Sequence, residues 1–494
     1  MLLANRSLVL HQLGQHRAAL HDLKRSLASG YPQSSVYKLY SRQAWCFSSL
    51  GQKEVAAHCL ERARAAANLL AGEEREKALD YVREKCVVAG QTGPDQVVSS
   101  PVLAQPSPLY PGLTRKVQLV SSPDKGRHLL AQETISPGEI LAVDTGALTV
   151  LSPARSSSNC GECLASTLTP HHCPTCRAVV FCSSQCRAAA LASHHSHECC
   201  LALPDLARLQ QERSEDQQSC SSLLLILRFF TQKTQQFFRS HRAEFSRALD
   251  GTGEPREPEE EAPYLSSDYQ RLVELVCHRK TDLLGEVWQI TLGIFILHCL
   301  AYCGWLDHRL EQAGDLTEED VYLTLLAVHM RGVTSFNTHQ VGERLSSTGS
   351  LLQTQEVGLA VRPTVALINH SCWPNTVRCS AGRQVVMMAT RTIKAGQEVT
   401  DIYTESFYEA SRVDRQEKCQ EYRFDCGCEA CSQHWPLLSS LSSSLQDTPP
   451  SDLRPNIPRH LLNTLAREIS QLQDQANNHW NQGNIQQSLG KFEY

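Results

Sequence analysis

Cysteine spacing constrains this 494-residue chain more than any other feature. Within one stretch of 40 residues, three cysteine pairs are followed by a histidine–cysteine pair: Cys160, Cys163, Cys173, Cys176, Cys182, Cys186, His195 and Cys199. A CxxC turn presents two thiolates to one metal ion, and ligands four residues apart, such as Cys182 and Cys186, share one face of a short helix. Eight soft ligands are enough for two closed tetrahedral zinc sites, which would supply most of the folding energy of so small a segment.

One ligand in this stretch has neighbours of similar chemistry. His194, His197 and Cys200 could each replace His195. We prefer His195 because it lies four residues before Cys199, the spacing that puts two side chains on one helix face.

The number and placement of the cysteines also indicate the compartment. The chain has 21 cysteines, which would suit a secreted disulfide scaffold. Polar side chains interrupt the first twenty residues, however, so these do not form the apolar core of a signal peptide. Because the cysteines also cluster in metal-type pairs, we expect a reducing compartment.

Charge and hydropathy argue against two classes of partner. The formal net charge of −5 gives no whole-chain basis for nucleic-acid binding, and between Cys160 and Cys199 the only Lys or Arg residues are Arg177 and Arg187. The most apolar stretch, Ile290 to Ala301, is shorter than the roughly 20 residues that a membrane-spanning helix needs. We therefore expect no direct nucleic-acid binding and no membrane span, and we predict a buried helix over this stretch.

Residues 1–70 show an internal helical repeat. Aligning the Leu-Gly pair at 13–14 with that at 50–51 brings small residues into register: Ser7 with Ala44, Ala19 with Ala56, and Ser26 with Ala63. Small residues at these offsets let two antiparallel helices approach closely, as tetratricopeptide (TPR) repeats do. An ordinary amphipathic helical hairpin is the alternative.

The C-terminal region carries a similar pattern. Asn477–Tyr494 has a helix–Gly–helix pattern with its turn at Gly483, and it stops in mid-helix. We interpret residues 433–494 as a linker followed by the start of further TPR-like helices, cut short in this chain. Linkers rich in Pro, Gly, Ser or acidic residues are predicted at 91–111, 250–263 and 437–458.

Separate segments carry the remaining chemistry. Lys125–Leu129 followed by Ile135–Leu141 predicts a turn and strand and then a hairpin, although a plain β-hairpin explains it equally well. Leu367–Asn375 reads LINHSCWPN, and Gly396–Tyr403 reads GQEVTDIY. Further on, Tyr422–Cys431 contains three cysteines at CxCxxC spacing, one ligand short of a tetrahedral zinc site.

These motifs resemble known families. The stretch 160–199 resembles a MYND finger, whose zinc ligands interleave. The NHSCWPN segment at 369–375 is similar to the cofactor-binding core of SET methyltransferases, and the segment ending at Tyr403 is similar to their GEE…Y segment. In the SET fold these two segments cross in a pseudoknot. The order of the parts along the chain resembles the SMYD family of protein-lysine methyltransferases, which combine SET and MYND domains.

The resemblance implies a role for each site residue. Tyr403 and Tyr422 would be catalytic, with Tyr422 on a strand leading to a zinc site. The cofactor, S-adenosylmethionine, would contact Lys125, Gly126, Arg127, Asn337, Asn369, His370, Tyr403 and Phe424. Asn337 is explained equally well as a residue that ends a helix.

The resemblance also implies three structural zinc ions. One would be held by Cys160, Cys163, Cys182 and Cys186, and the second by Cys173, Cys176, His195 and Cys199. The third would take the cysteine of the NHSC motif together with the CxCxxC segment: Cys372, Cys426, Cys428 and Cys431.

The expected fold is a multidomain α+β architecture. A β-rich SET fold would hold an inserted MYND zinc finger and a helical insert, end in a cysteine-rich post-SET zinc site and be flanked by TPR-like α-helical repeats. The expected parts are the first repeats at 1–70, the N-terminal part of the SET domain at 112–155, the MYND finger at 160–199, the helical insert at 201–348, the SET core at 349–408, the post-SET site at 409–432, and the linker and second repeats at 433–494.

The implied function is a protein-lysine N-methyltransferase that transfers a methyl group from S-adenosylmethionine to histone or non-histone proteins in the nucleus and cytoplasm. The MYND finger and the TPR-like repeats would bind further protein partners. Three departures from the family pattern favour a slow enzyme: His128, which would narrow the cofactor entrance, Gln397 and Ile402. The alternative is a MYND and TPR scaffold or transcriptional co-regulator whose SET domain is weak or inactive.

Overall fold

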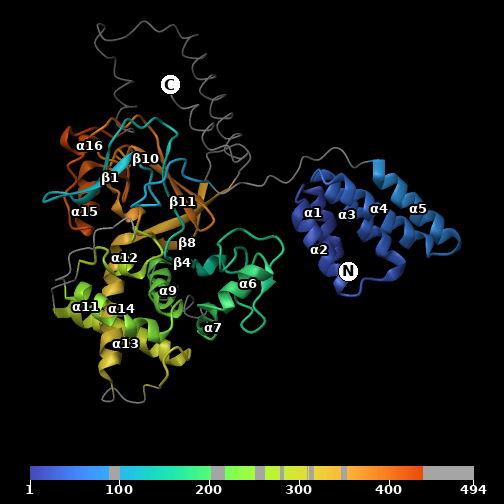
Figure 1. Cartoon of the computed structure of the whole chain (residues 1–494), viewed down its shortest axis with the longest axis horizontal. Helices are drawn as coiled ribbons and strands as arrows, with labels where there is room; N and C mark the ends of the chain where they lie inside the picture. Colours follow the sequence, from blue (N-terminus) through green and yellow to red (C-terminus); the bar gives the residue numbers. More distant parts are fainter. Residues whose placement is uncertain are drawn as a thin grey trace, which may run out of the picture. The chain divides into compact units, whose positions relative to one another are not determined.

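The computed structural model describes residues 1–87, 101–201, 217–250, 262–278, 283–308, 310, 316–345 and 353–437 (Figure 1). The chain divides into two compact units, Met1–Ser99 (unit 1) and Ser100–Tyr494 (unit 2). Each unit has its own hydrophobic core. Of the predicted C-terminal linker and repeats at 433–494, residues 438–494 lie outside the described residues, as do most of the acidic linker and part of the first linker.

Unit 1 is helical throughout its described part. Its elements are α1 (Leu2–Gln12), α2 (His16–Ala28), the 3-10 turn η1 (Gln33–Ser35), α3 (Val36–Ser49), α4 (Lys53–Asn68) and α5 (Gly72–Val87). Gly14 and Gly51 have positive φ angles of 73° and 77°, which lets the chain reverse after α1 and after α3 without strain. The two helix pairs match the predicted repeat, whereas α5 extends the helical region beyond residue 70.

The small residues aligned in the sequence lie where these helices pack. All six are buried: Ser7, Ala19, Ser26, Ala44, Ala56 and Ala63. Leu23 and Leu39 are fully buried in the same core. The close helix approach predicted from the small residues is therefore confirmed, whereas the assignment to the TPR family stays a prediction.

Unit 2 contains several small sheets. Its strands are β1 (Val117–Ser122), β2 (Gly126–Ala131), β3 (Ile140–Asp144), β4 (Leu148–Leu151), β5 (His171–His172), β6 (Val180–Phe181), β7 (Thr338–Leu345), β8 (Gln353–Val361), β9 (Asn369–His370), β10 (Thr376–Ala381), β11 (Gln384–Ala389) and β12 (Thr400–Asp401). They pair as β1–β2, β10–β11–β3, β4–β8–β7 and β5–β6, all antiparallel, and as the parallel pair β12–β9. Because β3 pairs with β11 and β4 pairs with β8, segments before and after the helical region build the sheets together.

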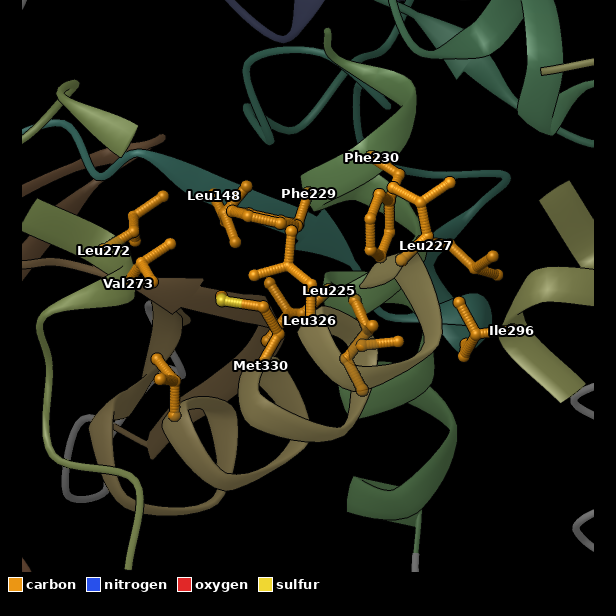
Figure 2. Close-up of a cluster of buried hydrophobic side chains, with 14 of the residues drawn as sticks. Leu148, Leu225, Leu227, Phe229, Phe230, Leu272, Val273, Ile296, Leu326 and Met330 are labelled. Carbon is orange, nitrogen blue, oxygen red and sulfur yellow. The ribbon is translucent and has the colours of Figure 1, made fainter. Parts of the chain in front are cut away.

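The helices of unit 2 are α6 (Ser184–Leu191), α7 (His195–Glu198), α9 (Gln217–Thr231), α10 (Gln235–Ser240), α11 (Arg242–Leu249), α12 (Tyr269–Val273), α13 (Leu283–Tyr302), α14 (Glu318–Asn337), α15 (Arg412–Glu421) and α16 (Glu429–Ser432). Helix α9 packs on β4 and β8, and α14 contacts β7. The largest core joins α9, α13 and α14 to β4 and β8. Figure 2 shows part of it, in which Leu148 of β4, Phe229 of α9 and Met330 of α14 belong to one cluster. A capping box of Thr317 and Asp320 starts α14.

The region predicted as a helical insert also contains a strand. Helix α14 ends at Asn337, and β7 begins at Thr338 and pairs with β8. The predicted boundary at residue 349 therefore falls between the two strands of a hairpin. A short segment of mixed polarity such as 338–345 carries little periodicity, so only its pairing with β8 identifies it as a strand.

Helix α13 is less buried than predicted. By length and composition alone, its stretch Gly285–Tyr302 is apolar enough to cross a membrane, and 28% of that stretch is buried. Ile296 packs in the core, but Trp288 and Phe295 are exposed. An apolar pattern on every side predicts burial on every side. The expectation of a buried helix at Ile290–Ala301 is wrong for the outer face, because within the described residues only the other face has neighbours.

Candidate active site and zinc clusters

The two motif segments near residues 370 and 400 lie against each other. Strands β9 and β12 pair in parallel, with Asn369 opposite Thr400 and His370 opposite Asp401. The backbone N–H of Ser371 donates to the Asp401 carbonyl over 2.8 Å. The structure thus brings together the two segments expected to cross.

Asn375 connects the two crossing segments by hydrogen bonds. Its side chain is buried, donates to the Glu398 carbonyl over 2.8 Å and accepts from the Thr400 N–H over 2.9 Å. The Thr376 hydroxyl donates to the Thr400 carbonyl over 2.8 Å. Sequence reasoning gave Asn375 no role, and its position in the NHSCWPN motif was the one signal that pointed to it.

Hydrogen bonds hold Tyr403 on both sides. Its backbone N–H donates to Nδ1 of His370 over 2.9 Å, and its hydroxyl donates to the Ile368 carbonyl over 2.8 Å. Because Nδ1 accepts, neutral His370 carries its proton on Nε2, which lies 3.4 Å from Sγ of Cys372. Burial raises the pKa of the Tyr403 phenol above its ordinary value, so the hydroxyl stays a neutral donor at physiological pH.

Aromatic rings surround Tyr403. Its ring centroid lies 5.4 Å from that of His370, 5.5 Å from Tyr422 and 6.3 Å from Phe424. Phe336, near the end of α14, lies 6.2 Å from Tyr422. Tyr422 caps the C-terminus of α15, so the expectation of a strand there is wrong. The residues before it form a helix, which begins at a serine cap.

The N-terminal turn joins the same site. The Asn369 side chain donates to the Lys125 carbonyl over 3.0 Å, and Nζ of Lys125 lies 2.7 Å from the Glu398 carboxylate. Gly126 has a φ of 62°, a left-handed conformation that a residue without a Cβ adopts readily. The turn is thereby bonded to both crossing segments.

These segments enclose a cavity of about 1060 Å³. Every predicted cofactor and catalytic residue lines it: Lys125, Gly126, Arg127, Asn337, Asn369, His370, Tyr403, Tyr422 and Phe424. His128 is not among the described lining residues, because its ring is buried with Nδ1 3.0 Å from the Gly126 carbonyl oxygen. The expected narrowing of the entrance by His128 is therefore wrong.

Asn337, a predicted cofactor residue, bonds through its side chain to two backbone carbonyls. Its side-chain nitrogen donates to the Val276 carbonyl over 2.7 Å and to the Val333 carbonyl over 2.8 Å. Both amide hydrogens are thus used within the protein. The geometry fits the alternative role, in which Asn337 ends α14 and ties it to the cavity segment containing Val276.

Three clusters have the composition and spacing of zinc sites. Their ligand atoms lie within 4.8 Å of one another in the sets Cys160, Cys163, Cys182 and Cys186; Cys173, Cys176, His195 and Cys199; and Cys372, Cys426, Cys428 and Cys431. Sulfur–sulfur distances are 3.5 Å for Cys163–Cys182 and 3.7 Å for Cys173–Cys199. A tetrahedral ion with zinc–sulfur bonds of ~2.3 Å has edges of about 3.8 Å, so the clusters fit Zn²⁺.

Cys182 and Cys186 lie close together although they do not share a helix face. Cys182 follows β6, whereas Cys186 lies in the first turn of α6 behind the capping residue Ser183. The pair therefore spans a strand end and a helix start, contrary to the expected single helix. The two sulfurs still lie 3.5 Å apart.

His195, rather than its neighbours, faces the second cluster. Its Nε2 lies 3.6 Å from Sγ of Cys176. His194 lies 3.9 Å from the Glu162 carboxylate, and Nδ1 of His197 lies 3.4 Å from a backbone carbonyl oxygen of another segment. The structure thus gives the second cluster the histidine that we preferred by spacing.

The third cluster joins the crossing to the C-terminal part of unit 2. Sγ of Cys372 lies 3.8 Å from that of Cys426 and 3.6 Å from that of Cys431. Cys419 is buried in the same cluster, a contact that sequence reasoning missed because nothing in the local spacing marks it. Burial raises the pKa of the Cys431 thiol, and the buried Arg415 guanidinium, 3.6 Å from its sulfur, offsets part of that effect.

A family model described as SET domain matches residues 126–404, more than half of the chain. The chain belongs to the SET domain family. The matched range begins at Gly126 in the N-terminal turn and ends just after Tyr403, so it contains both crossing segments. The SET match therefore covers most of the segments that line the cavity, whereas Lys125 and the lining residues 422–429 lie outside it.

The chain is similar to several curated lysine methyltransferases, most of them named SMYD proteins. Protein-lysine N-methyltransferase SMYD4 from Mus musculus is 24% identical over 497 residues, which cover 87% of this chain and 61% of the relative. Histone-lysine N-methyltransferase ASHR1 from Arabidopsis thaliana is 25% identical over 318 residues, which cover 63% of this chain and 54% of the relative. N-lysine methyltransferase SMYD2-B from Danio rerio is 32% identical over 120 residues, 24% of each chain. The chain spans 60–62% of the length of its SMYD4 relatives.

Proposed function

We propose that this chain carries the catalytic part of an S-adenosylmethionine-dependent protein-lysine N-methyltransferase. The observation that carries the proposal is the convergence of Asn369, His370, Tyr403 and Tyr422, from distant segments, on one cavity. The SET family match and the relatives named as lysine methyltransferases support the same activity.

The cavity fits the cofactor in size and in chemistry. Single-ligand pockets usually hold 300–1,000 Å³, so about 1060 Å³ leaves room for a cofactor and a lysine side chain. Asn369 and His370 would hold the amino-acid and adenine ends of the cofactor. Lys125 and the adjoining Gly126 would contact it from the N-terminal turn, and the Phe424 ring would pack on it.

The residues around Tyr403 would prepare the substrate amine. When bound, S-adenosylmethionine supplies a methyl group on a positively charged sulfur. A substrate lysine must arrive as a neutral amine, because its ammonium, with a pKa near ~10.4, has no lone pair. The rings of Tyr403, Tyr422 and Phe336 form a wall that disfavours the charged form. The bond from the Tyr403 hydroxyl to the Ile368 carbonyl holds this wall in position and so helps to orient the amine.

We propose three structural zinc ions in the clusters described above. In the third cluster, Cys372 lies two residues after His370 and faces its Nε2. An ion bound there would fix the ring that accepts from the Tyr403 backbone. Zinc would thus support the geometry of the cavity without taking part in the reaction.

The proposed substrates are lysines of histone or non-histone proteins. The MYND-like finger and the helical repeats are proposed to bind protein partners. Several relatives carry histone-lysine or protein-lysine in their names, which supports this substrate class. We propose the nucleus and the cytoplasm as locations, because clusters of metal-type thiols persist in reducing compartments.

Isothermal titration calorimetry with S-adenosylmethionine tests cofactor binding directly. We expect the wild type to bind, and Asn369→Ala to bind at least about tenfold more weakly, because a hydrogen bond to a charged group contributes ~1.5–3 kcal/mol. Asn5→Ala makes the same chemical change at an exposed position of α1 and should bind like the wild type.

The same titration separates the enzyme from a scaffold. A wild-type protein with loaded zinc clusters that shows no detectable heat or binding would contradict the proposal. That result would favour a MYND and TPR scaffold with an inactive SET domain.

A further inference from the structure

Unit 1 contains a cluster of metal-ligand side chains outside the expected zinc sites. His11 lies in the last turn of α1, His16 is the first residue of α2, and Cys46 lies on α3. Their ligand atoms lie within 4.8 Å of one another. His16 and Cys46 are fully buried. Three helices thus bring one soft ligand each to a common point.

The distances in this cluster match the edges of a tetrahedral zinc site. The Nδ1 atoms of His11 and His16 lie 3.3 Å apart, and Nδ1 of His11 lies 3.7 Å from Sγ of Cys46. Zinc–nitrogen bonds of ~2.0–2.1 Å and zinc–sulfur bonds of ~2.3 Å give edges of about 3.3 Å and about 3.6 Å. The sulfur–nitrogen distance between Cys176 and His195 in the finger is 3.6 Å.

One metal ion would account for both contacts of His11. A ring nitrogen carries either one proton or one in-plane lone pair, so hydrogen bonding alone would serve two partners only through a shared, three-centre bond. Nδ1 of His11 nevertheless faces both His16 and Cys46. Trp45 stacks on the His11 ring, with centroids 5.1 Å apart and planes inclined by 24°, and so helps to fix the direction of this nitrogen.

We propose that His11, His16 and Cys46 bind one Zn²⁺ ion, with the fourth position left to water. Imidazole nitrogen and thiolate sulfur are ligands that Zn²⁺ prefers, and three protein ligands with an open position are an established zinc geometry. The ion cross-links α1, α2 and α3.

Arg42 connects α1 and α3 beside this site. It lies one helical turn before Cys46 on α3, and its guanidinium donates to the Ser7 hydroxyl over 2.8 Å and to the Ala4 carbonyl. These bonds hold the two helices that carry His11 and Cys46 against each other.

Metal content of the purified full chain tests the proposal. Inductively coupled plasma mass spectrometry should find one zinc ion fewer per chain in Cys46→Ser and in His16→Ala than in the wild type. Cys59→Ser is the matched control, because Cys59 is also buried in unit 1 but belongs to none of the described metal clusters. Circular dichroism should show helical content close to wild type in all four proteins.

A measurement on the wild type keeps the test valid if a variant fails to fold. Cadmium-113 NMR of the cadmium-loaded chain should show one signal in the range of a site with a single thiolate, separate from signals of thiolate-rich clusters. Equal zinc content in all four proteins, or the absence of that cadmium signal, would overturn the proposal. Because the test compares unit 1 variants with the wild type, its result does not depend on whether the SET domain binds cofactor.

Discussion

Replacing Asn375 by alanine should loosen the crossing of the two SET segments. The side chain is 7% exposed and bonds one segment to two backbone groups of the other, the Glu398 carbonyl and the Thr400 N–H. Alanine can make neither bond. The substitution therefore removes a link between the two crossing segments without changing any residue that would carry the reaction.

The two bonds set the size of the effect. A buried polar group left without a partner costs ~1–3 kcal/mol, so two groups cost about 2–6 kcal/mol. Glu398 and Thr400 line the cavity, and water there can replace part of the lost bonding. We therefore expect about 2–3 kcal/mol. For a domain of this size, each kcal/mol lowers the melting temperature by roughly 2–4 °C.

Thermal unfolding and cofactor calorimetry measure the two consequences. Asn375→Ala should melt about 4–12 °C below the wild type and bind S-adenosylmethionine more weakly. Thr376→Ser is the matched control, because it keeps the hydroxyl that donates to the Thr400 carbonyl and should lose about 1 kcal/mol at most. A wild-type melting temperature and cofactor affinity in Asn375→Ala would refute the reasoning.

Three further perturbations probe other parts of the fold. Gly358→Ala should abolish soluble expression, because its Cβ would lie 2.1 Å from the Val150 carbonyl oxygen. Glu198→Gln should lower the free energy of unfolding by about 3–5 kcal/mol in denaturant titrations, because it leaves the Arg228 guanidinium buried without its counter-charge. Burial raises the pKa of the Tyr403 phenol in the folded protein above its ordinary value of ~10. Above pH ~10 the unfolded chain therefore loses this proton before the folded protein does, and the free energy of unfolding falls as pH rises toward the raised pKa. Thermal scans above pH ~10 should therefore show falling stability, less steeply in Tyr403→Phe.

A different result in each experiment would contradict its expectation. A wild-type soluble yield of Gly358→Ala would contradict the first, and a free energy of unfolding lowered by less than about 1 kcal/mol in Glu198→Gln would contradict the second. Parallel alkaline curves for the wild type and Tyr403→Phe would remove the role given to burial of the phenol.

Short-range spacing allowed much of the zinc chemistry to be predicted. A zinc ion restricts its ligands to a few spacings, so Cys160-x2-Cys163 and His195-x3-Cys199 are informative before any fold is known. Cys372 is different, because its partners begin more than fifty residues further on. Only the resemblance to SET proteins linked it to them, and the structure brings all four sulfurs together.

Contacts that arise from packing could not be predicted in the same way. The bond from Asn337 to the Val276 carbonyl exists because α14 is held on the large core beside that segment. The proximity of His11, His16 and Cys46 depends on how three helices stack. Local patterns describe which face of a helix is apolar, but they do not specify which neighbour covers that face or which polar side chain it meets.

Transfer of a labelled methyl group is the most direct test of the proposed function. Wild type, Tyr403→Phe and Tyr408→Phe would each be incubated with labelled S-adenosylmethionine and a cell lysate, and the modified lysines identified. Tyr408→Phe makes the same chemical change at an exposed position outside the cavity. We predict lysine labelling by the wild type and Tyr408→Phe, and a loss of about 10- to 100-fold in Tyr403→Phe, equivalent to ~1.4–2.7 kcal/mol of barrier. Identical labelling by all three proteins would contradict the assignment of Tyr403 to the catalytic site.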